Sequence, residues 1–238
     1  MALNALVVSR ARRPQCLRSL RTAPHDLPHF TVHDAAATLV LTSAAVLLAL
    51  ASDPAQAHGY ISSPAASYAN SYTKTSYNAL ISEGVNAAFR GRKWNGSPED
   101  NVKQFTEAFA ASGEASLKAL LDAAAPGCGN SRVDVAPVDV SGLSALQFRN
   151  DEYREGFVAS HHGPCEVWID STRAFHGDDC RAQFPSYPAT IPVDYSACAP
   201  GKTCTLTFYW LALHEPQWQV YKQCVPITRG GGASLRRS

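Results

Sequence analysis

Beyond residue 128, apolar and polar residues alternate in short runs bounded by proline and glycine turns. This period of two is typical of half-buried strands. Short strands separated by many turns predict an antiparallel β-sandwich of the immunoglobulin/fibronectin type. The shorter runs with this pattern are residues 133–135, 146–148, 156–159 and 165–169.

Two longer apolar runs predict the centre of this sandwich. Residues 203–213 (TCTLTFYWLAL) are followed, after the Glu215-Pro216 turn, by residues 217–227. Two strand patterns joined by a short turn predict antiparallel neighbours. Residues 229–238 (RGGGASLRRS) predict a flexible tail, so the domain is expected to span residues 58–228.

Residues 76–125 predict a helical insertion near the amino end of the domain. Apolar residues recur at helical spacing over residues 77–89. Ser97 followed by Pro98 and two acidic residues indicates a helix start, with Ser97 as the N-cap. A third helical segment is expected over residues 115–125.

An apolar run before the domain predicts a secretory signal. Residues 35–51 are mostly alanine, leucine and valine, and Ala55-Gln56-Ala57 after them is a small-residue cleavage site. The run is short for a membrane span, although an uncut signal anchor is the alternative. We expect removal of residues 1–57, which makes His58 the first residue.

The composition and net charge exclude some classes of partner but do not identify a function. The chain of 238 residues is 45% hydrophobic and 17% charged, as globular proteins are, and its formal net charge is +1. Residues 1–57 carry five arginines and three aspartates, a net of +2, which leaves −1 on the processed part. So small a charge attracts neither nucleic acid nor an anionic membrane. We expect a monomer with neither as a partner.

Cysteine usage agrees with secretion. Seven cysteines are present, and six remain once Cys16 has been removed. An even number in an exported domain predicts three disulfides, for which several pairings are possible. Cys198 and Cys204 flank a turn and are expected to pair. The favoured set is Cys198–Cys204, Cys128–Cys224 and Cys165–Cys180.

A histidine at the start of a processed chain can chelate a metal ion. His58 would offer its ring nitrogen and a free α-amine, whereas the backbone nitrogen of an internal histidine is an amide. A second histidine is available in residues 160–164 (SHHGP), where Gly-Pro would hold an imidazole at the sheet edge. The spacing to Gly-Pro favours His161 over His162.

Further candidate ligands follow the first long run. His214 closes that run, and Gln219 and Tyr221 lie two positions apart on the next, so they share one face of a strand. Planar nitrogen ligands with an axial oxygen suit copper, whereas zinc prefers a tetrahedral set with a further Cys, His or carboxylate. Because the cysteines are expected in disulfides, one copper ion per chain is the favoured cofactor.

In combination, these motifs resemble the lytic polysaccharide monooxygenases. The marks are His58 after a signal peptide, S-H-x-G-P in residues 160–164, and A-L-H … Q-x-Y-x-x-C in residues 212–224. The helical insertion and residues 210–224 are most similar to the pectin-active family of these enzymes from oomycetes.

The resemblance implies a secreted enzyme that oxidatively cleaves a plant cell-wall polysaccharide, above all pectin (homogalacturonan). It implies a copper ion held by His58 and His161, with Tyr221 as the axial group. It also implies that His214 and Gln219 position an oxygen species by hydrogen bonding. The implied partners are the polysaccharide, an external electron donor, and hydrogen peroxide or dioxygen.

Plainer explanations compete with this one. His214 can be a core histidine and Tyr221 a buried strand tyrosine. The protein can be a non-catalytic secreted binder of copper or carbohydrate, and cellulose and chitin are alternative substrates. No hydrolase pair is evident, because Glu166 and Asp170 are expected to be ordinary surface residues of one strand. His176 is expected in a surface loop.

Contacts to an anionic polymer are expected around His58, where cations would help. The candidate cations are Lys74, residues 90–94 (RGRKW) and, less favoured, Lys222, which can also be ordinary solvated residues. The candidate stacking residues are Tyr60, Tyr68 and Tyr72, which can equally pack their own loop.

Overall fold

The two long apolar runs form neighbouring strands, as predicted. β10 (Thr203–Ala212) and β11 (Trp218–Thr228) pair antiparallel along their whole length. They lie inside a sheet with the order β3-β11-β10-β7-β8, to which β5 adds a short parallel pairing with β11. The other strands of this large sheet are β3 (Ala79–Ile81), β5 (Val138–Asp139), β7 (Cys165–Ile169) and β8 (Thr172–Gly177).

The computed structural model of the protein describes residues 59–230. The predicted signal segment, His58 and residues 231–238 of the predicted tail lie outside the described residues. Within the described part, no helix is long and apolar enough to cross a membrane.

A second antiparallel sheet packs on one face of the large sheet and completes a β-sandwich. Its order is β1-β6-β9, and β2 pairs separately with β4. Phe148 of β6 meets Phe208 and Trp210 of β10 in the apolar core between the sheets, with ring centroids 5.1 and 5.6 Å apart. The predicted class, a mainly β antiparallel sandwich, is confirmed. The bounds are β1 (Tyr60–Ser63), β2 (Ser67–Tyr68), β4 (Ser131–Arg132), β6 (Ala145–Arg149) and β9 (Ala189–Pro192).

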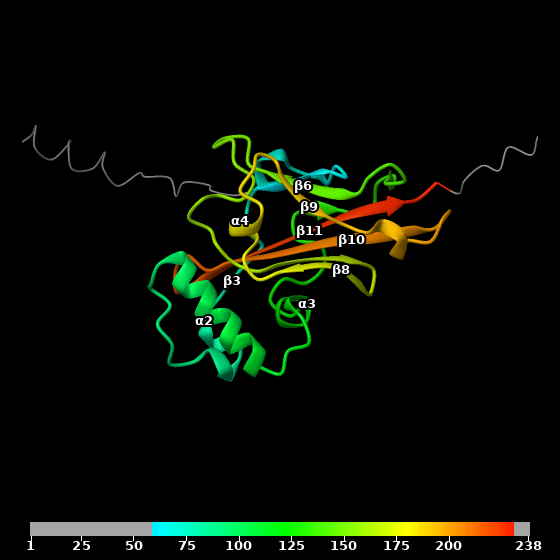
Figure 1. Cartoon of the computed structure of the whole chain (residues 1–238). Helices are drawn as coiled ribbons and strands as arrows, with labels where there is room; N and C mark the ends of the chain where they lie inside the picture. Colours follow the sequence, from blue (N-terminus) through cyan, green and yellow to red (C-terminus); the bar gives the residue numbers. More distant parts are fainter. Residues whose placement is uncertain (1–58, 231–238) are drawn as a thin grey trace, which may run out of the picture. The chain divides into compact units, whose positions relative to one another are not determined.

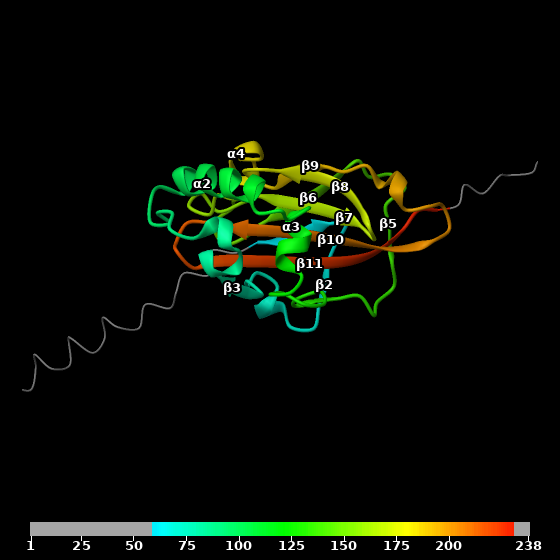
Figure 2. The same ribbon diagram turned by 90° about the horizontal axis from the view of Figure 1, so that it is seen from below.

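Helices cover the opposite face of the large sheet. Figure 1 shows α2 and α3 on one side of β10, and β6 and β9 on the other. Figure 2 looks onto the helical side. Tyr209 and Leu211 of β10 join the apolar cluster with these helices, whereas Phe208 and Trp210 face the sandwich core. Because both faces are covered there, the second half of β10, residues 208–212, is continuously apolar.

The helix start predicted at Ser97 is confirmed. Its Oγ accepts a hydrogen bond from the N–H of Asp100 at 3.1 Å, and Pro98 opens α2 (Pro98–Ala111). The third predicted segment contains the shorter helix α3 (Leu117–Leu121). The remaining short helices are η1 (Ser71–Thr73), η2 (Glu83–Val85), η3 (Ala87–Phe89), α4 (Cys180–Gln183) and η4 (Tyr195–Ala197).

The prediction of a helix over residues 77–89 is wrong. This stretch forms β3, which pairs with the edge of β11, and then the two 3-10 turns η2 and η3. The side chains of Ser82 and Asn86 accept hydrogen bonds from N–H groups two residues on. Such local side-chain bonds compete with a continuous helix, and the open edge of β11 supplies the strand partner.

All three favoured disulfides are present in the structure: Cys128–Cys224, Cys165–Cys180 and Cys198–Cys204.

The strands predicted at residues 133–135 and 156–159 are absent, because both segments are turns and bends. Phe157 is nevertheless fully buried, and its ring stacks on Phe148 with 5.0 Å between centroids. Its apolar character therefore reflects a loop that packs on the core.

Candidate metal centre

Contacts join the predicted site residues at one end of the large sheet. The ring of His161, in the loop before β7, stacks on that of His214, with 3.8 Å between centroids and 27° between planes. The ring centroid of His161 also lies 6.2 Å from that of Trp210. The ring of Trp210 stacks on that of Tyr221, with 4.5 Å between centroids. Gln219 and Tyr221 are two positions apart on β11 and share one face of it.

The backbone of β10 holds the loop that carries His161. The N–H of Leu213 donates to the carbonyl oxygen of His162 at 2.9 Å. Gly163 passes so close to β10 that a Cβ there would lie 1.8 Å from the carbonyl oxygen of Leu211, and its φ is +155°. Only glycine tolerates this position, which explains the glycine after the two histidines.

The two adjacent histidines have different surroundings. His161 is 5% exposed, and its Nδ1 lies 2.9 Å from Oγ of Ser160. His162 instead places Nδ1 2.7 Å from Oδ2 of Asp179 and Nε2 3.5 Å from Oε1 of Glu99. Because carboxylates engage both ring nitrogens of His162, the geometry favours His161 as the candidate ligand.

Tyr221 offers a neutral phenol oxygen. The side chain is fully buried, and its hydroxyl donates to Oε1 of Gln219 at 2.5 Å. Burial raises the pKa of Tyr221, and Tyr77 adds to the effect. The hydroxyl therefore keeps its proton around neutral pH. A neutral oxygen of this kind suits a weak axial contact to a metal ion.

His214 carries a buried nitrogen that lacks a hydrogen-bond partner among the described residues. That atom is Nδ1. Burial lowers the pKa of His214, and the charge of Glu215 opposes this only in part. The ring is therefore neutral around pH 7. An orphaned buried polar atom is uncommon, and here it lies in the ring that stacks on His161.

The amino end of the described chain is fixed to β11 by Gln223. Its Nε2 donates to the carbonyl oxygen of Gly59 at 2.9 Å, and its Oε1 accepts from the N–H of Ile61 at 2.9 Å. Gln223 was not a predicted site residue, although its spacing of two from Tyr221 could have indicated it.

Residues 59–230 alone contain no group of three or more His, Cys, Asp or Glu side chains that could hold a metal ion. Their six cysteines are all in disulfides, which removes thiolates as ligands. Of the predicted ligands, this part supplies the imidazole of His161 and the phenol of Tyr221. The remaining nitrogens would have to come from His58, outside the described residues.

Several predicted surface contacts are engaged elsewhere. Lys222 is 5% exposed, and its Nζ binds Oδ1 of Asp122 at 2.7 Å under the helical layer, so it is no surface cation. Trp94 belongs to the apolar core of the same layer. Arg92 pairs with Glu107 at 3.2 Å.

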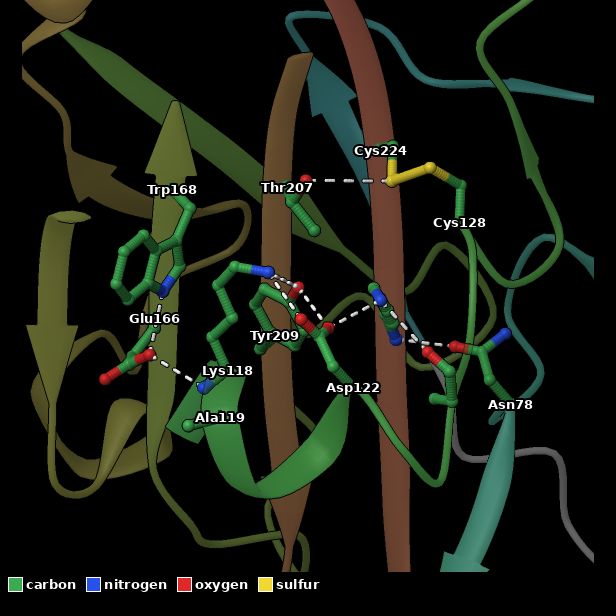
Figure 3. A network of polar contacts seen from close by, with 12 residues as sticks. Asn78, Lys118, Ala119, Asp122, Cys128, Glu166, Trp168, Thr207, Tyr209 and Cys224 are labelled. Atoms are coloured by element: carbon green, nitrogen blue, oxygen red, sulfur yellow. Dashed lines mark hydrogen bonds and ion pairs between the residues drawn. A yellow bond between two sulfur atoms is a disulfide. The ribbon is translucent and has the colours of Figure 1, made fainter. Parts of the chain in front are cut away.

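The expectation that Glu166 is a surface residue is wrong. Its side chain is fully buried and accepts hydrogen bonds from the backbone N–H of Lys118 at 3.0 Å and from Nε1 of Trp168 at 2.8 Å (Figure 3). Arg173 and His176 pair with it at 3.0 and 3.2 Å, and His176 lies in β8, not in a loop. Burial by itself would raise the pKa of Glu166, but these hydrogen bonds outweigh it and lower the pKa to about 2.

Comparison with known proteins gives this chain no assignment: no family model and no curated protein matches it. The case for a metal centre therefore rests on the residues themselves, namely His161, His214, Gln219 and Tyr221 beside the anchored Gly59.

Proposed function

We propose that the protein is the precursor of a secreted copper monooxygenase that oxidatively cleaves glycosidic bonds in pectin (homogalacturonan), in the manner of the lytic polysaccharide monooxygenases. One observation carries the proposal. His161 stacks on His214 and is linked through Trp210 to Tyr221, and Tyr221 shares a face of β11 with Gln223, the residue that fixes Gly59. That is where a metal-chelating first residue would need its partners.

The available donors suit copper better than zinc. Imidazole and amine nitrogens with a weak oxygen on the axis match copper preferences. Zinc prefers four ligands that include thiolate, imidazole or carboxylate. The thiols of the described part are oxidised, and the carboxylate of Asp179 already binds His162.

When bound, copper would supply one-electron redox chemistry with dioxygen or hydrogen peroxide, sustained by an external electron donor. The α-amine and ring of His58 would hold the ion together with His161. Oγ of Ser160 lies 2.9 Å from Nδ1 of His161 and would help to orient that ring. Neutral His214 and the amide of Gln219 would orient the oxygen species by hydrogen bonds.

Removal of residues 1–57 is part of the proposal. In the uncut chain the nitrogen of His58 is an amide, which cannot serve as the second nitrogen of the chelate. Three disulfides in the described part agree with export to an oxidising compartment.

A secreted, non-catalytic protein that binds copper or carbohydrate is the second candidate. It would use the same two histidines. The hydrogen bond between Tyr221 and Gln219 favours the enzyme, because a copper carrier has no evident need for an axial phenol held by an amide.

Product analysis tests the function. The chain from His58 onward would be loaded with copper and incubated, with and without reductant, with homogalacturonan, cellulose or chitin. We expect oxidised galacturonides, by mass spectrometry, only when reductant is present. Oxidised products from another polymer would change the substrate and keep the chemistry. Hydrolytic products alone would contradict the copper mechanism, and tight copper binding without any product would favour the non-catalytic protein.

Replacing each of the two adjacent histidines tests the ligand assignment. His161→Ala should abolish tight copper binding and oxidation together, as followed by copper titration and product yield. His162→Ala is the matched control. It should keep copper binding, although it loses the contact to Asp179 that holds its loop. Normal cleavage by the His161→Ala protein would show that the assignment is wrong.

A further inference from the structure

A fully buried asparagine joins the first turns of α2 to the end of β10. Nδ2 of Asn101 donates to the carbonyl oxygens of Leu213 at 2.7 Å and of Trp94 at 3.2 Å. Its Oδ1 accepts from the N–H of Gly96 at 3.2 Å. The amide nitrogen and the amide oxygen are therefore both engaged, as a buried polar side chain requires.

The hydrogen bond to Leu213 joins parts of the chain that are 112 positions apart. β10 ends at Ala212, and the last antiparallel pair of β10 and β11 is Ala212 with Gln219. The carbonyl group of Leu213 thus lies just beyond the ladder of the two strands. Because a buried carbonyl oxygen needs a donor, the side chain of Asn101 takes the place of a strand partner there.

Both backbone groups of Leu213 are committed at the candidate site. Its N–H donates to the carbonyl oxygen of His162 at 2.9 Å, which holds the loop that carries His161. Its carbonyl oxygen is held by Asn101, and the next residue is His214. Leu213 is therefore fixed on one side to the loop of His161 and on the other side to α2. It directly precedes the ring that stacks on His161 with 3.8 Å between centroids.

The position of the His214 ring depends on this backbone. Its Nδ1 is buried and has no hydrogen-bond partner among the described residues, so no hydrogen bond at that nitrogen orients the ring. Stacking on His161 sets the separation of the two rings, but it is less directional than a hydrogen bond. The backbone that Asn101 holds one residue earlier is thus the nearest fixed point for the ring.

We propose that Asn101 is a positioning residue of the candidate metal centre. By holding the carbonyl oxygen of Leu213, it sets the ring of His214 over that of His161. The inference rests on the proposed function and gives the helical layer a part in the reaction. Asn101 acts through His214, which would orient the oxygen species, and not by contact with the polymer. Its loss should therefore slow oxidation more than it weakens the binding of copper or of polymer.

The NMR signals of the histidine rings test the positioning without any reaction. In the metal-free processed chain, labelled in histidine, stacked rings shift the signals of each other. Asn101→Ala should remove the mutual shifts of His161 and His214, and Asn101→Leu, which removes the amide and keeps most of the volume, should do the same. Val102→Ala is the matched control, because Val102 is the next residue of α2 and packs in the apolar cluster of the helical layer. It should lower the Tm by roughly 3–10 °C, as Asn101→Ala does, and leave the ring signals unchanged.

Rates of oxidation test the consequence for the reaction. With copper, reductant and galacturonan, Asn101→Ala should lower kcat about tenfold and leave KM and copper affinity within about twofold. A double-mutant cycle with His214→Ala separates positioning from stability. In the His214→Ala background, Asn101→Ala should lower kcat no further, although it still lowers the Tm. Val102→Ala should keep the full rate.

Three results would overturn the positioning role and leave the proposed function standing. They are unchanged ring signals in a folded Asn101→Ala protein, an equal loss of rate in Val102→Ala, and an additive loss of rate in the double variant with His214→Ala. A protein that binds copper but oxidises no polymer would instead overturn the proposed function. The ring signals would then still decide whether Asn101 sets the two rings.

Discussion

Gly59 lies against the ring of Phe148 with no room for a side chain. A Cβ at this position would be 2.3 and 2.6 Å from two ring atoms of Phe148. Phe148 in turn contacts Trp210, the ring that stacks on Tyr221. A methyl group at Gly59 would therefore disturb the residue that follows the proposed ligand and the neighbours of Tyr221.

We expect Gly59→Ala to cost about 1–3 kcal/mol of unfolding free energy, as overpacked cores do, and to weaken copper binding. Thermal unfolding and copper titration of the chain from His58 onward measure both effects. Gly142→Ala is the control, because no atom lies within 4 Å of its added Cβ. Equal behaviour of the two variants would mean that the amino end is not fixed by packing on Phe148.

At the scale of elements, β11 organises the site. Gln219, Tyr221 and Gln223 alternate along one face of this strand, and Gln223 binds four groups with its amide. Its Oε1 accepts from the N–H of Ile61 and the hydroxyl of Tyr68, and its Nε2 donates to the carbonyl oxygens of Gly59 and Lys74. Gln223 is 3% exposed, so water cannot readily replace it.

Gln223→Leu should lower the unfolding free energy by roughly 2–5 kcal/mol, because it leaves buried donors and acceptors unpaired. Hydrogen exchange at the N–H of Ile61 should accelerate, and copper affinity should fall although no ligand has changed. Denaturant unfolding, exchange rates and copper titration check these outcomes. The exposed Gln217→Leu serves as the comparison and should change stability by less than about 0.5 kcal/mol. Unaltered exchange at Ile61 in the Gln223 variant would contradict the anchoring role.

The long elements were predictable from the sequence, because each carries a strong local signal. Two long apolar runs joined by a short turn indicated β10 and β11, and Ser97-Pro98 indicated the start of α2. The prediction failed at residues 77–89 because their apolar residues recur at helical spacing. In the structure, residues 79–81 of this stretch pair with the edge of β11 as a strand. Local periodicity cannot show which sheet edge will be open.

Prediction of the candidate site was uneven for a similar reason. The motif residues on β11 and in the loop before β7 were named, but Gln223 and the buried state of Glu166 were missed. The alternation of apolar and polar residues around Glu166 predicted a strand with one solvent-exposed face. In the structure, α3 covers that face. The continuous apolar run of residues 208–213 was the available signal that the large sheet is covered on both sides.

At the scale of the whole molecule, charged side chains join the helical layer to the sandwich. Glu166 of β7 receives the backbone N–H at the start of α3 and the charges of Arg173 and His176 from β8. Beyond it, Asp122, at the end of α3, accepts from the hydroxyl of Tyr209 at 2.7 Å (Figure 3). The two carboxylates thus fix both ends of α3 to β7, β8, β10 and β11 of the large sheet.

This arrangement makes stability depend on pH in a defined direction. The folded pKa of Glu166 is about 2 against an ordinary 4.5, so its contribution is complete above about pH 4.5 and is lost as the pH falls toward 2. The hydrogen bond to Glu166 raises the pKa of His176 above 6.5, and burial opposes it. That contribution is complete below 6.5 and is lost as the pH rises through the raised pKa. Together the pair stabilises the fold most between about pH 4.5 and 6.5.

Glu166→Gln should therefore lower stability near pH 6 by on the order of 3 kcal/mol, the free energy equivalent of its pKa shift. The loss of stability between pH 4.5 and 2 should become shallower without disappearing, because the pKa of Asp122 is also lowered to about 2. Thermal unfolding across this range measures the slope. The exposed Glu152→Gln should leave the profile unchanged. If Glu166→Gln and Glu152→Gln gave the same acid slope, the charge of Glu166 would not help to join α3 to the sheet, and Asp122 and the apolar contacts would hold the helical layer.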